Sequence, residues 1–247
     1  MPLKITNEHV LHLKRINHHK YELDKRGTYC LSFNRFERLN REQKKLGLIV
    51  DEQSIFVTKN ARNLMTMVFV IEELQDNDQI VIKLDGNAAS GKTTLAQQLS
   101  MIYEMNVIHM DDFFKKPEID QTTAYGKYAT NIDFNKMNQS VVKPFLSKDK
   151  ICYRPFDFKT HSHVGEVRLP YKKYLLIEGA YSMHPSLKID AGLTVFYGIG
   201  KYKQIKRIYD RNGFKRLRMF LKKWIKNENA YHKALETQSS ATVVLKA

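Results

Sequence analysis

An eight-residue motif in the first half of the chain constrains the fold more than any other feature. Residues 86–93, Gly-Asn-Ala-Ala-Ser-Gly-Lys-Thr, match the pattern G-x-x-x-x-G-K-[ST] at every defined position. An apolar, β-rich run at 80–84 precedes the motif, and a helical pattern at 92–103 follows it. A glycine-rich turn between a strand and a helix lets backbone N–H groups surround a phosphate at the helix N-terminus. The motif therefore predicts a phosphate-binding loop, or P-loop.

The P-loop motif also assigns roles to its residues. Lys92 is expected to reach the β- and γ-phosphates of ATP, and the hydroxyl of Thr93 is expected to ligate Mg²⁺. The alternative is a glycine-rich turn without a ligand, which the strand–helix context disfavours. The expected nucleotide-binding set is Gly86, Asn87, Ala88, Ala89, Ser90, Gly91, Lys92, Thr93 and Thr94.

Short apolar runs alternate with helical patterns after the P-loop. Strand candidates lie at 106–110, 174–177 and 193–197, and helix candidates lie at 134–146, 202–211 and 214–235. This alternation predicts an α/β fold of the P-loop NTPase type, with a doubly wound, mainly parallel sheet flanked by helices. We place this domain at residues 77–247, with a weakly ordered tail at 237–247.

Residues 1–76 form a predicted N-terminal extension that is mostly helical, with helices expected at 35–46 and 60–75. The turn Asp76-Asn77-Asp78 separates it from the α/β domain. The sequence leaves three roles open for the extension: a cover for the sheet edge, a contact within a homo-oligomer, or a binding site for a partner.

The net charge of the chain indicates which class of partner to expect. Lys and Arg number 41 against 26 Asp and Glu, and this net charge of +15 favours an anionic partner such as a nucleotide, a nucleic acid or an anionic surface. Residues 201–226 contain 11 Lys or Arg and one acid, which raises the alternative of a nucleic-acid-binding NTPase. No nucleic-acid motif is recognised there, and basic helices are usually solvated, so nucleic acid is not the expected partner.

Other classes of protein are excluded by simple features. The longest apolar run, 64–71, is too short to span a bilayer, so no membrane partner is expected. The N-terminal residues lack the apolar block of a signal peptide. Two cysteines, Cys30 and Cys152, cannot form a disulfide framework. These features predict a cytoplasmic protein.

Acidic residues follow two of the predicted strands. Asp111 comes after the run at 106–110, and Glu178 ends the run at 174–177. Ligands of open α/β sheets bind at the carboxyl ends of the strands. Asp111 there could accept a hydroxyl proton or hold Mg²⁺, and Glu178 has the Walker B position of a Mg²⁺ ligand. The alternative for both is a solvated surface acid.

Five segments in order resemble the uridine kinase and nicotinamide riboside kinase group of P-loop kinases. The resemblance covers about residues 79–235 and implies a Mg-ATP-dependent kinase for a small-molecule alcohol. Uridine or cytidine is the implied acceptor, with nicotinamide riboside or another sugar or vitamin alcohol as the alternative. The segments are the P-loop, Asp111–Lys115 (close to D-[DS]-F-[FY]), Phe156–Ser162, Ile177–Gly179 and Lys206–Asn212; Trp224-Ile225-x-x-Glu228-x-x-Tyr231 resembles a helix of bacterial uridine-kinase-like proteins.

The resemblance also implies roles for individual residues. Asp111 would be the base that activates the acceptor hydroxyl, and Glu178 would help to hold Mg²⁺. A small β-hairpin on the substrate side would carry acceptor contacts, with Phe156 where the family has Tyr and His163 where it has Arg. The implied acceptor-binding set is Asp111, Phe114, Asn131, Asp133, Phe156, Asp157 and His161.

Several of these residue roles have alternatives. His161 could instead be a solvated loop histidine, which is the favoured interpretation without the resemblance. Asn131 and Asp133 could contact ribose hydroxyls, and Asp133 could equally be a helix N-cap. In the kinase interpretation, Arg207 or Arg211 belongs to a lid that closes over the phosphates, since arginine pairs with phosphate at two points. The two arginines are four residues apart and share one helix face, so the sequence does not choose between them.

Overall fold

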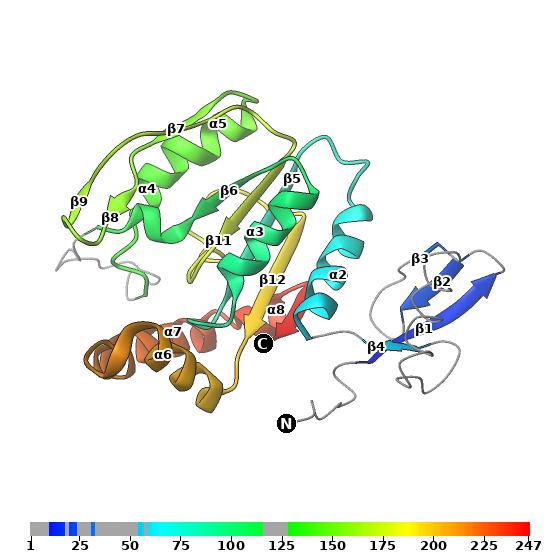
Figure 1. The fold of residues 1–247 in the computed structure, drawn as a ribbon. Helices are drawn as coiled ribbons and strands as arrows, with labels where there is room; N and C mark the ends of the chain where they lie inside the picture. Colours follow the sequence, from blue (N-terminus) through cyan, green and yellow to red (C-terminus); the bar gives the residue numbers. More distant parts are fainter. Residues whose placement is uncertain (1–9, 18–19, 24–30, 33–53, 57–58, 116–127) are drawn as a thin grey trace. The chain divides into compact units, whose positions relative to one another are not determined.

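The computed structural model describes residues 10–17, 20–23, 31–32, 54–56, 59–115 and 128–247. The chain divides into two compact units, Met1–Asp76 and Asn77–Ala247. The first unit contains an antiparallel sheet in the order β3-β2-β1-β4, followed by one helix (Figure 1). Its elements are β1 Val10–Asn17, β2 Lys20–Leu23, β3 Leu31–Ser32, β4 Ser54–Phe56 and α2 Lys59–Glu72.

The sequence analysis predicted a mostly helical extension and did not predict this sheet. Three of its strands have two to four residues, which is too short to show the alternation that reveals a strand. Helix α2 corresponds to the helix expected at 60–75. The helix expected at 35–46 lies outside the described residues.

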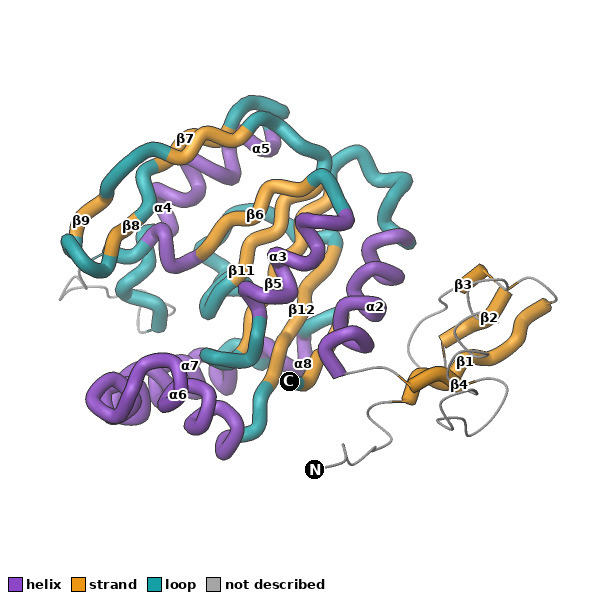
Figure 2. The backbone as a smooth tube through the Cα atoms, in the orientation of Figure 1, coloured by secondary structure: helices purple, strands orange, loops and turns teal. Residues whose placement is uncertain are grey.

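The second unit is built on a five-stranded parallel sheet in the order β13-β12-β5-β11-β6 (Figure 2). Its buried strands are rich in Ile, Val and Leu, as expected for a sheet covered on both faces. The predicted doubly wound α/β fold is confirmed. The strands are β5 Ile80–Gly86, β6 Met105–His109, β11 Tyr174–Glu178, β12 Leu193–Gly198 and β13 Val243–Lys246.

Helices cover the two faces of this sheet. Helix α3 (Lys92–Ile102) follows the P-loop and buries Leu95 and Leu99. The buried core cluster joins Val81 and Leu175 of the sheet to the helical segment opposite. That segment comprises α4 Phe134–Met137, a π-helical turn at Asn138–Val142, and α5 Lys143–Leu146.

The C-terminal region differs from the sequence prediction. Residues 237–247 were expected to be weakly ordered, but they form α8 (Thr237–Ser240) and β13, which pairs in parallel with β12. The apolar run Val243-Val244-Leu245 gives β13 the side chains of a sheet strand. Helix α6 (Lys201–Met219) has a kink at Gly213, where φ is 73°, and this kink lies between the helices predicted at 202–211 and 214–235. A π-helical turn at Phe220–Trp224 then leads into α7 (Ile225–Ala234).

A small antiparallel hairpin of β8 (Phe156–Asp157) and β9 (Ser162–His163) lies beside a second pair, β7 (Ile151–Tyr153) with β10 (Val167–Leu169) (Figure 1). The hairpin coincides with the one expected on the substrate side. None of the helices in the described residues is long and apolar enough to cross a membrane.

Candidate active site

The P-loop connects β5 to α3 through a backbone that only certain residues allow. Gly86 has φ 131°, and a Cβ there would lie 2.2 Å from the backbone oxygen of Tyr197 in β12. Ala89 has φ 60°, in the left-handed region. The Nζ of Lys92 donates to the carbonyl oxygens of Gly86 (2.8 Å) and Asn87 (2.9 Å). The ammonium group is thus held against the loop that is expected to surround phosphate.

The carboxylate of Glu178 joins the P-loop helix to the neighbouring strand. Its Oε1 accepts hydrogen bonds from Oγ1 of Thr93 (2.9 Å) and Nδ1 of His109 (2.6 Å). The hydrogen bond to Glu178 raises the pKa of His109, although partial burial opposes it. The parallel register pairs Glu178 of β11 with His109 of β6. Two predicted magnesium ligands, Thr93 and Glu178, are therefore in direct contact.

This donor set fits Mg²⁺ bound together with a nucleotide. Thr93 and Glu178 offer one hydroxyl and one carboxylate, and Mg²⁺ in phosphotransfer sites is usually held by one or two carboxylates, substrate phosphates and water. Within the described part of the chain, no three His, Cys, Asp or Glu side chains are grouped so that they could hold a metal ion. The site therefore suits a metal that arrives with phosphates more than a metal held by protein alone.

The two neighbouring acids after β6 have different surroundings. Asp112 accepts a hydrogen bond from the hydroxyl of Tyr153 at 2.8 Å. The Asp111 carboxylate accepts no hydrogen bond from the described residues. Loss of hydration raises the pKa of Asp111, the negative charge of Glu178 raises it further, and Lys92 lowers it. Among the described residues, Asp112 is therefore engaged with Tyr153, whereas the Asp111 carboxylate has no hydrogen-bond partner.

Aromatic rings from three segments meet beside the hairpin. The Phe114 ring lies 4.9 Å from that of Phe158 and 5.6 Å from that of Trp224. Phe156 contacts both Phe114 (6.3 Å) and His161 (6.5 Å). The structure therefore brings together three residues of the expected acceptor set, Phe114, Phe156 and His161, and adds Trp224, which follows α6.

The other residues of the expected acceptor-binding set have different hydrogen-bonding environments. Asp133 caps α4, because its Oδ1 accepts from the backbone N–H of Lys136 at 2.9 Å, which is the capping alternative. Asp157 accepts from the N–H of Lys159 (2.9 Å) and so stabilises the hairpin turn. The Nδ2 of Asn131 is buried and has no hydrogen-bond partner in the described structure.

The structure separates the two candidate lid arginines. Arg207 donates from Nη1 to the carbonyl oxygens of Ala89 (3.0 Å) and Ser90 (2.9 Å) in the P-loop. Arg211 is exposed, and its Nε donates to Oδ1 of Asn212 at 2.8 Å. Of the two, Arg207 is the one that contacts the nucleotide loop.

The sequence analysis missed Asp85, a fully buried acid at the end of β5. Its Oδ1 accepts from the N–H groups of Gly86 (2.7 Å) and Tyr181 (3.3 Å), and its Oδ2 accepts from the N–H of Met183 (3.0 Å) and the hydroxyl of Tyr231 (2.7 Å). The signal was present, because Asp85 follows an apolar strand as Asp111 and Glu178 do. The roles of Gln204 and Glu228, which also contact the P-loop, were missed as well.

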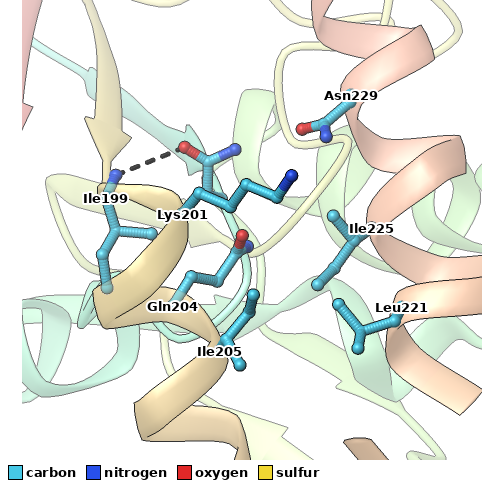
Figure 3. Close-up of a pocket in the computed structure, with 8 residues that line it drawn as sticks. Ile199, Lys201, Gln204, Ile205, Leu221, Ile225 and Asn229 are labelled. Carbon is cyan, nitrogen blue, oxygen red and sulfur yellow. Dashed lines mark hydrogen bonds between the residues drawn. The ribbon is translucent and has the colours of Figure 1, made fainter. Parts of the chain in front are cut away.

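A cavity of about 220 Å³ lies beside the P-loop, between α6 and α7 (Figure 3). Its lining combines aliphatic side chains with amide and ammonium groups. The side chain of Asn87 accepts from the N–H of Ile199 at 3.3 Å at one side of this cavity. The lining residues are Asn87, Ile199, Lys201, Gln204, Ile205, Leu221, Ile225 and Asn229.

Comparison with known proteins supports the fold. A possible uridine kinase from Bacillus stearothermophilus has a similar structure, with a TM-score of 0.54 and 21% sequence identity over 76% of this chain and 97% of that one. A protein from Thermus thermophilus (TM-score 0.36, 15% identity, 69% of this chain and 90% of that one) and an uncharacterized protein from Eubacterium ventriosum (TM-score 0.37, 16% identity, 68% and 88%) match less well. No protein-family model and no curated protein matches the sequence. The first likeness shows the fold, a P-loop NTPase-like α/β sheet of the kind found in kinases.

Proposed function

We propose that this protein is an ATP-dependent phosphotransferase that transfers the γ-phosphate of ATP to a hydroxyl of a nucleoside-like molecule, with uridine or cytidine as the acceptor. One observation carries the proposal: the carboxylate of Asp111, which accepts no hydrogen bond from the described residues, lies at a strand end within electrostatic reach of Lys92 and Glu178. A protein that only bound nucleotide would not need an unpaired base there. The likeness to a possible uridine kinase supports the same class of enzyme.

The transfer step gives a role to each of the site's side chains. Asp111 takes the proton of the acceptor hydroxyl, the hydroxyl oxygen forms a bond to the γ-phosphorus, and the bond to the β-γ bridging oxygen breaks to release ADP. Lys92 stabilises the charge on the phosphates. Thr93 and Glu178 would hold Mg²⁺, which neutralises phosphate charge when bound. The P-loop and the aromatic cluster orient the two substrates for in-line attack.

The contacts around the site support a nucleoside-like acceptor. Phe114, Phe156 and Trp224 present flat rings on the hairpin side, and a planar base can stack on such rings. The buried amide nitrogen of Asn131, which has no hydrogen-bond partner among the described residues, would offer a hydrogen-bond donor. The cavity lined by Asn87 of the P-loop would take part of the ATP molecule.

An ATP-consumption screen tests the proposal. The purified protein would be incubated with Mg-ATP and uridine, cytidine, other nucleosides, nicotinamide riboside or vitamin alcohols, and products would be identified by mass. We expect a phosphorylated nucleoside, with uridine or cytidine as the best acceptor. ATP consumption that depends on added RNA, with binding that falls steeply with salt, would instead indicate a nucleic-acid-dependent NTPase.

A further inference from the structure

One peptide unit of the P-loop is held at both ends by buried side chains of the C-terminal helices. The N–H of Ala88 donates to Oε1 of Glu228 on α7, and its carbonyl oxygen accepts from Nε2 of Gln204 on α6 at 3.1 Å. Glu228 is 3% exposed and Gln204 is 5% exposed. We infer that Glu228 and Gln204 are positioning residues that keep the P-loop in its phosphate-binding conformation.

The loop needs such support because its next residue is strained. Ala89 has φ 60°, a conformation that residues other than glycine adopt uncommonly and that persists where the surroundings impose it. If Ala89 relaxed, the N–H groups around it would turn away from the phosphate site. A fixed Ala88 peptide on one side and the Arg207 contacts to Ala89 and Ser90 on the other prevent this relaxation.

Glu228 suits this task because a carboxylate only accepts hydrogen bonds, so it pairs with an N–H and not with a carbonyl. The ring of His232 lies behind it, with Nε2 3.7 Å from Oε1. Hydrogen bonding alone does not require the negative charge, since an amide oxygen accepts equally well.

A competing explanation makes Glu228 an anion that competes with phosphate. That explanation predicts tighter nucleotide binding when the charge is removed, whereas the positioning role predicts weaker binding only when the acceptor atom is lost.

The inference rests on the proposed function only in that the P-loop binds ATP, so its test measures ATP binding without an acceptor. A fluorescent ATP analogue would be titrated with Mg²⁺ into the full-length protein and its variants. Glu228→Ala should raise Kd about tenfold, because the binding-competent fraction of the loop falls to about one tenth. Glu228→Gln should bind like the wild type. Asn227→Ala, at an exposed position of α7, is the matched control.

Gln204→Ala supplies an independent measurement, and it stands in for Glu228→Ala if that variant fails to fold. It should also raise Kd. The double variant should raise Kd by a smaller factor than the product of the two single factors, because both residues hold the same peptide. In the kinase assay with the best acceptor, KM for ATP should rise in the alanine variants while KM for the acceptor stays constant.

Several results would overturn the inference. These are wild-type or tighter ATP-analogue binding by Glu228→Ala and Gln204→Ala, a Glu228→Gln variant as weak as Glu228→Ala, and a parallel rise of both KM values. A wild-type protein that binds the analogue but phosphorylates no member of the acceptor panel would refute the proposed function. It would leave the comparison of Kd values intact.

Discussion

Replacing Asp111 by asparagine should lower the catalytic rate and raise the stability of the fold. The opposite signs of these two changes distinguish loss of the base from general damage to the structure. Asparagine keeps the shape of the side chain but cannot accept the proton of the acceptor hydroxyl. Loss of general-base catalysis costs about 10²- to 10⁴-fold in rate. At about 1.36 kcal/mol per factor of ten, this corresponds to about 2.7 to 5.4 kcal/mol in the activation free energy. ATP affinity should change little, since Lys92 and the P-loop are untouched.

The sign of the stability change follows from the raised pKa of Asp111. The folded protein holds the Asp111 proton more tightly than the unfolded chain, so ionised Asp111 disfavours the folded state at neutral pH. Asp111→Asn removes this charge, and the melting temperature of the metal-free protein should rise. The positive charge of Lys92 reduces this gain, because it lowers the pKa of Asp111.

Asp112→Asn is the matched control for this experiment. The amide oxygen still accepts from the hydroxyl of Tyr153, so kcat should stay close to that of the wild type, with at most a small loss of stability. Steady-state kinetics with the best acceptor and thermal melts at pH 7.5 would be run on both variants. Near wild-type turnover of Asp111→Asn, or an equal loss in Asp112→Asn, would refute the assignment of the base.

Three further predictions concern the surrounding residues. Lys92→Ala should abolish ATP binding or turnover while circular dichroism shows an intact fold. Arg207→Ala should lower kcat strongly, because Arg207 contacts the P-loop, whereas Arg211→Ala and Lys222→Ala should have small effects; equal effects of all three would remove the special role of Arg207. The raised pKa of His109 should give the metal-free protein stability that is complete below pH 6.5 and is lost as pH rises through the raised pKa. Urea unfolding across this range should show the loss, and His109→Asn should flatten it.

Local sequence signals predicted the centre of the site. The P-loop pattern fixes a strand, a turn and a helix within a dozen residues, and Asp111 and Glu178 follow apolar runs at strand ends. Parallel strands bring such ends to one edge of the sheet, so contact between Thr93 and Glu178 follows from topology. The same reasoning could have included Asp85, which ends β5.

Other features depend on tertiary contacts that no local pattern contains. Arg207 and Arg211 share one helix face in the sequence, and only the position of the P-loop distinguishes them. Asp133 proved to be a helix cap because its side chain turns toward the N–H of Lys136. The strand β13 has an apolar sequence, but it is stabilised by pairing with β12, almost fifty residues earlier.

The contacts of Asp85 explain why helix α7 belongs to the site. A buried carboxylate is costly unless its oxygens are satisfied, and Asp85 accepts four hydrogen bonds. Three come from backbone N–H groups that begin the P-loop or follow β11, and the fourth comes from Tyr231 of α7. Tyr231 is itself buried, and burial raises the pKa of its hydroxyl, which therefore remains a donor at neutral pH. Since Glu228, one turn earlier on α7, accepts from the N–H of Ala88, helix α7 contacts both the P-loop itself and the buried acid that precedes it.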